Sequence, residues 1–185
     1  ILTADRLSGR EKAINKKIKL KFRPLELDDL KLIYNWFKVP EINQWYAQGK
    51  DWSMADIEAK YKPRLIGNEV VPSFIIKLDS KCIGFIQYYL LSKGSMPEGL
   101  SFEDALKKKV DINTSVGIDL FIGDEPLIGH GLGKSIIRDF IKTVIPKNYV
   151  TIFIDPTQSN VRAVKAYKKV GFKEYPHQGN DNICL

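Results

Sequence analysis

A glycine-rich stretch in the second half of the chain could bind an anion. Residues 129–134 read Gly-His-Gly-Leu-Gly-Lys, after the apolar run 116–122 and before the amphipathic run 132–145. Glycine permits tight backbone turns, and the free N–H groups at a helix start face an anion with the positive end of the helix dipole behind them. The pattern is neither a Walker loop nor a complete dinucleotide-binding fingerprint, and an ordinary strand-to-helix turn is the alternative. We predict a loop that binds a pyrophosphate.

An asparagine and a tyrosine further along the chain could act on the same ligand. Asn160 and Tyr167 are seven residues apart, so on a helix both project from roughly the same face. Residues 155–159 offer N-cap chemistry, and Gly171 predicts a C-cap. One helix face can therefore carry an amide and a phenol into one cleft.

Two carboxylates follow or interrupt predicted strands. Asp119 lies within the apolar run 116–122, where an ionised group is costly unless it faces a cleft or has a partner. Asp155 comes at the end of a predicted strand and directly before Pro156. A surface-facing strand position is the alternative for Asp119, and a simple Asp-Pro turn is the alternative for Asp155.

The remaining segments predict the elements that position these groups. Alternating polarity predicts strands, and apolar residues at helical spacing predict helices. Along the chain we expect a strand at 17–22, helices at 27–37 and 56–65, a hairpin of strands 73–78 and 82–91, a polar insertion at 92–114 with a short helix near 102–109, a strand at 115–122, a helix at 132–145, a strand at 149–154, the helix that carries Asn160 and Tyr167, and a final β segment. This order predicts an α/β (α+β) fold, in which helices flank both faces of a mixed central sheet.

Length and composition indicate one globular domain. With 185 residues, 44% of them hydrophobic, the chain can bury roughly two-thirds of its unfolded surface. We predict a tail or extra helix at 1–15 and one domain at 16–185. No apolar run approaches the roughly 20 residues of a membrane span, and residues 1–15 lack the apolar segment of a secretion signal. A cytoplasmic protein that does not bind membranes is expected.

Charged and metal-ligating residues narrow the possible partners. The net charge of +7 has three possible explanations: solvent-exposed basic faces, attraction of a phosphorylated coenzyme, or binding of a nucleic acid. No nucleic-acid-binding motif accompanies the charge. Arg162 and Lys165, on the Asn160 helix, are the best candidates for attracting a coenzyme. Two cysteines and two histidines are too few for a disulfide framework or a histidine-rich metal site. We expect neither nucleic acid nor metal to bind.

The order of strand, glycine loop, helix, strand and Asn160 helix resembles that of the GNAT-type N-acetyltransferases. Within that superfamily the chain is most similar to the aminoglycoside 6'-N-acetyltransferases, over about residues 19–172. The similar segments are 23–25, 44–46, 83–87, 117–123, 129–133, 154–155 with Pro156, and 159–163. In one departure, Ile128 stands where the superfamily commonly has Arg or Gln, which removes a side-chain contact to the pyrophosphate and leaves the backbone donors.

The resemblance implies a single-domain GNAT fold that transfers acetyl from acetyl-CoA to an amine by direct attack, without a metal. It implies catalytic roles for Asp119, which would accept a proton from the amine, and for Tyr167, which would donate one to the thiolate. A backbone N–H near residues 121–123 would polarise the carbonyl, at a break in the strand that Gly123 fits. The implied coenzyme contacts are Phe121, Ile122, Gly123, Gly129, His130, Gly131, Leu132, Gly133, Lys134, Asn160, Ala163 and Tyr167. The implied substrate contacts are Trp45, Tyr46, Tyr61, Gln87, Asp119 and Asp155, with ordinary core packing as the alternative for the aromatic residues and Gln87.

Several acceptors fit this resemblance. The small-molecule amine would be the 6'-amine of an aminoglycoside, a polycation that acidic residues in the insertion and around Asp119 could attract. The alternatives are a siderophore-type hydroxylamine, another polyamine, or a noncatalytic domain that senses acyl-CoA. Either a monomer or a homodimer is compatible with the sequence.

Overall fold

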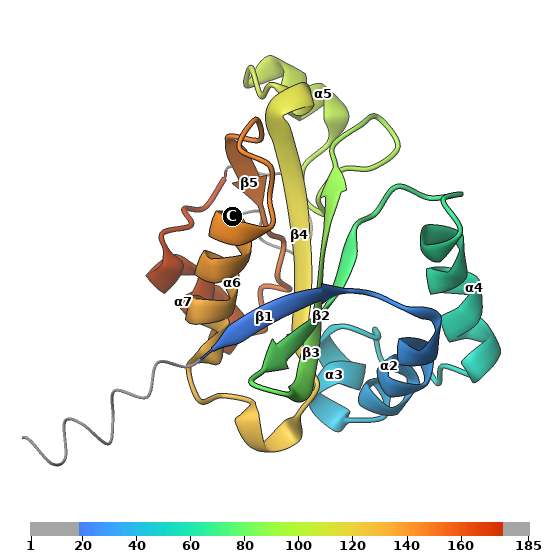
Figure 1. The fold of residues 1–185 in the computed structure, drawn as a ribbon. Helices are drawn as coiled ribbons and strands as arrows, with labels where there is room; N and C mark the ends of the chain where they lie inside the picture. The colour runs from blue at the N-terminus through green and yellow to red at the C-terminus, as the bar shows by residue number, and fades with distance from the viewer. Residues whose placement is uncertain (1–18, 176–185) are drawn as a thin grey trace, which may run out of the picture.

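The computed structural model describes residues 19–175 and contains one five-stranded sheet in the order β1-β2-β3-β4-β5 (Figure 1). Strands β1 to β4 pair in an antiparallel manner, and β5 is parallel to β4. The strands are β1 (Leu20–Pro24), β2 (Ser73–Leu78), β3 (Lys81–Leu90), β4 (Ser115–Ile122) and β5 (Thr151–Phe153). The predicted mixed sheet is therefore confirmed, and β4 has the predicted bounds.

Helices cover both faces of this sheet, as predicted. Figure 1 shows α6 and α7 on one side and α2, α3 and α4 on the other. The helices are η1 (Leu27–Asp29), α2 (Leu30–Phe37), α3 (Pro40–Trp45), α4 (Met54–Leu65), α5 (Phe102–Lys107), η2 (Ile112–Thr114), η3 (Glu125–Leu127), α6 (Leu132–Thr143) and α7 (Val161–Val170). Because side chains alternate along a strand, Ile86 and Ile118 pack beneath α6 and α7, whereas Phe85 and Phe121 pack beneath α2 and α4. Two apolar cores result, one on each face.

Some predicted elements differ from the structure. The predicted strand 149–154 is reduced to β5, and α3 was not predicted. No strand occurs at 171–175, and the rest of the expected final β segment lies outside the described residues, as does the expected division at residue 15. The N-terminal strand begins at Leu20, within the predicted range.

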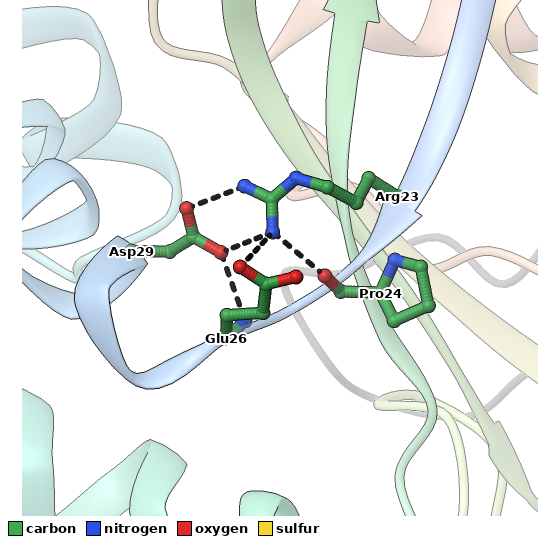
Figure 2. Close-up of polar contacts among 4 residues, drawn as sticks. All are labelled: Arg23, Pro24, Glu26 and Asp29. Carbon is green, nitrogen blue, oxygen red and sulfur yellow. Dashed lines mark hydrogen bonds and ion pairs between the residues drawn. The ribbon is translucent and has the colours of Figure 1, made fainter.

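The junction between β1 and η1 is fixed by one charged pair (Figure 2). Arg23 donates two hydrogen bonds to the Asp29 carboxylate, of 2.6 and 3.0 Å. The same carboxylate accepts the backbone N–H of Glu26 at 2.8 Å, which completes a capping box. The hydrogen-bonded carboxylate raises the pKa of Arg23 further, so the guanidinium remains charged at any physiological pH. It holds the start of α2 against the sheet.

Strands β4 and β5 separate soon after they meet. Their register runs only from Ser115↔Thr151 to Gly117↔Phe153, although β4 continues to Ile122 alongside β3. The second half of β4 therefore has no neighbour on its β5 side among the described strands. This opening is the feature of the fold that creates space for a ligand.

Candidate active site

A cavity of about 1120 Å³ occupies this opening. It is bounded by the second half of β4, the residues after β5, the glycine loop, α7 and α3. The predicted site residues that line it are Trp45, Tyr46, Gln87, Asp119, Phe121, Ile122, Gly129, Gly131, Leu132, Gly133, Lys134, Asp155, Asn160, Ala163 and Tyr167. Segments far apart in sequence thus meet at one cavity.

Three predicted site residues do not line this cavity. Tyr61 is completely buried and packs against Phe85, so it lies in the core instead of contacting a ligand directly. His130 is exposed, and its Nδ1 lies 3.0 Å from the carbonyl oxygen of Ile128. Gly123 is buried against Trp36: a Cβ there would lie 2.3 Å from the indole ring. Glycine is therefore required at 123 by close packing, and the break in pairing begins earlier, after Gly117.

The glycine loop leads directly into α6. Gly129 and Gly131 have φ angles of 80° and 81°, a conformation that favours glycine, and Gly131 is the N-cap of α6. Gly133 lies in the first helical turn and has no positive φ, so the prediction that it turns the backbone is wrong. Because residues 131–134 line the cavity, the start of α6, where backbone N–H groups have no helical partner, lies at the cavity wall and could bind an anion there.

An ion pair crosses the cavity beside this loop. Arg162 on α7 contacts Glu41 on α3, and a guanidinium nitrogen of Arg162 also lies close to Gly129. All three residues line the cavity. A cationic side chain is therefore already present next to the predicted phosphate position.

Backbone donors of β4 point into the opening. Gly123 donates its N–H to the carbonyl of Ile83 at 2.8 Å, and the carbonyl of Ser115 accepts the N–H of Leu91. The backbone N–H and C=O groups of the odd-numbered residues of β4 therefore point toward β3. Because backbone groups alternate along a strand, Leu120 and Ile122 direct their N–H groups away from β3 and toward the opening. The predicted carbonyl-polarising donor is thus Ile122 or Leu120, and neither Phe121 nor Gly123 is placed for this role.

Asp119 is the last residue in a chain of side-chain hydrogen bonds that begins at Arg64. Its Oδ2 accepts a hydrogen bond of 2.7 Å from Gln87 Nε2, and Gln87 Oε1 accepts one from Arg64 on α4. Burial raises the pKa of Asp119, an effect that the Gln87 hydrogen bond partly opposes. The carboxyl is therefore held in a fixed orientation with a pKa closer to neutrality. Arg64 was missed in the sequence, although it follows Tyr61 by three residues on an amphipathic helix.

Asp155 adds a second half-buried carboxyl to this end of the cavity. Burial and the nearby charge of Asp119 raise the pKa of Asp155 to about 8. Its Oδ2 accepts the backbone N–H of Glu98, from the insertion. Two neighbouring carboxyls whose pKa values are both raised would be stabilised in their ionised forms by a cation at this position.

Tyr167, on α7, lines the same cavity. Burial raises the pKa of this phenol, and the charges of Asp119 and Asp155 raise it further. The hydroxyl therefore stays protonated near pH 7 and is a potential proton donor.

Asn160 and Tyr46 have structural roles in addition to lining the cavity. Asn160 is the N-cap of α7, and its Oδ1 accepts the N–H of Ala163 at 3.1 Å, so only its amide donors remain for a ligand. Tyr46 packs against Phe121 with 4.7 Å between ring centroids, while Trp45 lies at the cavity wall. Lys60 on α4 also lines the cavity and was not predicted.

Metal-ligating clusters and membrane-spanning helices are absent from the described part of the chain. Residues 19–175 contain no group of three or more His, Cys, Asp or Glu side chains that could hold a metal ion. No helix within this range is both long and apolar enough to cross a bilayer.

Comparison with known proteins identifies the family to which this chain is similar. The model of a family described as "Acetyltransferase (GNAT) domain" matches residues 26–178. Aminoglycoside N(6')-acetyltransferase type 1 of Klebsiella pneumoniae is 28% identical over 148 residues, which cover 78% of this chain and 69% of the relative.

Solved structures agree with the family match. The structure of AAC(6')-Ib in complex with coenzyme A superposes with a TM-score of 0.73 at 26% identity, covering 90% of this chain and 94% of the other. A complex of AAC(6')-Ib with paromomycin and acetyl-CoA also gives a TM-score of 0.73, at 27% identity and 90% coverage of each chain.

Proposed function

The chain belongs to the GNAT acetyltransferase family and is an acetyl-CoA-dependent N-acetyltransferase, and from this premise we propose that its acceptor is the 6'-amine of an aminoglycoside. The observation that carries the proposal is the meeting of Asp119, Asp155 and Tyr167 at one cavity with shifted pKa values. Perturbed groups converging on a cleft are typical of catalytic sites.

The glycine loop is the proposed site for the pyrophosphate of acetyl-CoA. Gly129 and Gly131 expose backbone N–H groups at the start of α6, and Arg162 and Lys134 add positive charge beside them. The opening between β4 and β5 offers unpaired backbone groups along its length, which suits an extended pantetheine chain. When bound, acetyl-CoA supplies an activated acetyl group as a thioester.

Asp119 is the proposed acceptor of the amine proton. Its raised pKa brings the carboxylate closer to the pKa that suits a general base near neutral pH, and Gln87 fixes its orientation. Tyr167 would supply a proton to the departing sulfur, because its phenol stays protonated. Ile122 or Leu120 would donate a backbone hydrogen bond to the carbonyl oxygen as its negative charge develops.

A bound aminoglycoside would supply positive charge at the acceptor end of the cavity, where Asp119 and Asp155 lie. Asp119 and Asp155 repel each other when both are ionised, and a bound ammonium would stabilise both carboxylates. The acidic end lies inside a protein with a net charge of +7, so the cavity would attract a polycation locally. The relatives named above support this choice of acceptor.

An acceptor panel tests the proposal. Thiol release from acetyl-CoA should be measured with kanamycin-type aminoglycosides, simple polyamines and hydroxylamine siderophore precursors. We expect turnover with the 6'-amino aminoglycosides. Turnover with hydroxylamines or polyamines only would keep the reaction and replace the acceptor, whereas acetyl-CoA binding without any turnover would indicate a sensor domain.

A further inference from the structure

A lysine ammonium lies among aromatic rings at the acceptor end of the cavity. Lys60 Nζ is 5.0 Å from the ring centroid of Trp52 and 5.6 Å from those of Tyr46 and Tyr61. Aromatic faces attract cations at such distances. Tyr61 belongs to α4, and Tyr46 and Trp52 lie between α3 and α4. The three rings therefore form a cation site, and the protein's own Lys60 fills it.

This ammonium has few other interactions. Within residues 19–175, the side chain of Lys60 forms neither a hydrogen bond nor an ion pair of 4.0 Å or less. Burial and the charge of Arg64 lower its pKa, against the opposing attraction of Asp119. A flexible side chain held mainly by ring faces can be displaced by a better-bound cation, because no hydrogen bond would be lost.

Neighbouring basic residues on α4 behave differently. Lys62 is exposed and pairs with Glu58 at 2.5 Å, and Arg64 donates to Glu69 at 2.8 Å as well as to Gln87. These two cations are neutralised by their partners, whereas Lys60 faces the cavity without a carboxylate partner. Its charge therefore acts on whatever enters the acceptor end.

We propose that Lys60 is a specificity-determining residue: in the free protein its ammonium lies over the rings of Tyr46, Trp52 and Tyr61, and an ammonium group of the acceptor takes its place over Tyr46, the ring of the three that lines the cavity. The inference rests on the proposed polycationic acceptor. Lys60 competes with the acceptor for the Tyr46 ring face and repels its charges, so it lowers the affinity for polycations. The effect grows with the number of ammonium groups on the acceptor, because each meets the same repulsion.

Binding measured by calorimetry tests this role without requiring catalysis. The probes are a kanamycin-type aminoglycoside and its analogue with hydroxyl in place of the 6'-amine. Lys60→Gln removes the charge at similar size, and we expect it to bind the aminoglycoside about tenfold more tightly, the equivalent of about 1.4 kcal/mol and within the range of a cation–π contact, with a smaller gain for the analogue, which carries one ammonium group fewer. Lys60→Arg retains the charge and should show no such gain. Lys62→Gln removes an exposed charge from the same helix and should leave the affinity unchanged.

Each other outcome has a defined meaning. Equal affinity of wild type and Lys60→Gln, or no detectable binding by either, would overturn the inference. Weaker binding by Lys60→Gln, with an unchanged thermal transition, would also overturn it and would indicate that Lys60 donates to the acceptor. Lys60→Met, measured in parallel, removes the charge without adding an amide; absence of the gain in this variant would assign the tighter binding to a new contact of the introduced amide and overturn the inference. Tighter binding without thiol release would refute the proposed function and leave the role of Lys60 intact.

Discussion

The carboxyl of Asp119 and the phenol of Tyr167 owe their proposed roles to the same physical cause, burial. Burial disfavours the ionised form of each, so the pKa of both is raised. For a carboxyl this moves the pKa toward neutrality, where a base is most effective. For a phenol it keeps the proton in place, which is what a proton donor needs.

Replacement of the acid tests the first role. Asp119→Asn should lower kcat by roughly 100-fold, the scale of general-base catalysis, because the amide cannot accept the amine proton. The wild-type kcat should rise with pH through the raised pKa of Asp119, since only the ionised form acts as a base. This rise should vanish in the variant, while acetyl-CoA affinity stays nearly constant. Equal kcat values for both proteins across pH would remove Asp119 from the mechanism.

Replacement of the phenol tests the second role. Tyr167→Phe should lower kcat by roughly tenfold or more, because it removes the hydroxyl and keeps the ring packing against Phe172. Tyr34→Phe, on α2 and away from the cavity lining, is the matched control. Kinetics indistinguishable between the two variants would mean that Tyr167 is only a packing residue.

At the scale of elements, the glycine loop depends on backbone conformation at one position. Gly131 has a φ of 81°, and a Cβ there would meet no atom within 4 Å, so Gly131→Val should act through backbone strain and not through collision. We expect acetyl-CoA affinity to fall by about tenfold or more in a folded variant. Gly94→Ala is the control: Gly94 has no positive φ, has open space around it and lies outside the cavity lining, so this change should leave affinity unchanged. Fluorescence titration of both variants decides between loop geometry and a general effect of losing a glycine.

The junction of β1 with η1 should carry measurable stability. In Asp29→Asn, Arg23 loses the closer of its two carboxylate partners, with Glu26 remaining at 3.1 Å, and the backbone N–H of Glu26 loses its charged acceptor (Figure 2). We expect the free energy of unfolding to fall by about 2 kcal/mol. Asp28→Asn, at the exposed neighbouring position, should change it little. Similar urea midpoints for the two variants would argue against the pair as a stabilising contact.

Local sequence patterns predicted the elements with strong periodicity and missed those defined by tertiary contacts. The apolar run of β4 and the amphipathic pattern of α6 specify their own positions, whereas α3 is short and begins at Pro40 without a distinct period. Tyr61 and Gly123 were assigned to the site because sequence cannot distinguish packing beside a cavity from contact with a ligand. Lys60 and Arg64 were missed because two bases one helical turn apart ordinarily indicate an exposed face.

At the scale of the molecule, the cavity forms because β4 and β5 separate within a sheet that has an apolar core packed on each face. The core beneath α6 and α7 fixes the glycine loop and Tyr167, and the core beneath α2 and α4 fixes Asp119 through Gln87 and Arg64. The coenzyme end is thus built mainly on one face, and the acceptor end on the other. Substitutions can therefore affect one ligand without the other.

The buried carboxyls should make stability depend on pH. The pKa of Asp155 is raised to about 8 in the folded protein, so between roughly pH 4 and 8 the folded state binds a proton that the unfolded state has released. Its contribution should therefore be most favourable below about pH 4 and be lost as pH rises toward 8. Asp155→Asn should flatten this slope in urea unfolding between pH 5 and 8, although Asp119 leaves a residual slope of the same sign. Parallel profiles of variant and wild type would contradict the burial of this charge.

Identification of the acetylated product tests the central claim most directly. The protein should be incubated with acetyl-CoA and a kanamycin-type aminoglycoside, and the product analysed by mass and by NMR to locate the new amide. We predict one acetyl group, on the 6'-nitrogen, and no product from the analogue that carries hydroxyl at that position. Acetylation at a different amine, or equal thiol release with both compounds, would contradict the proposed acceptor.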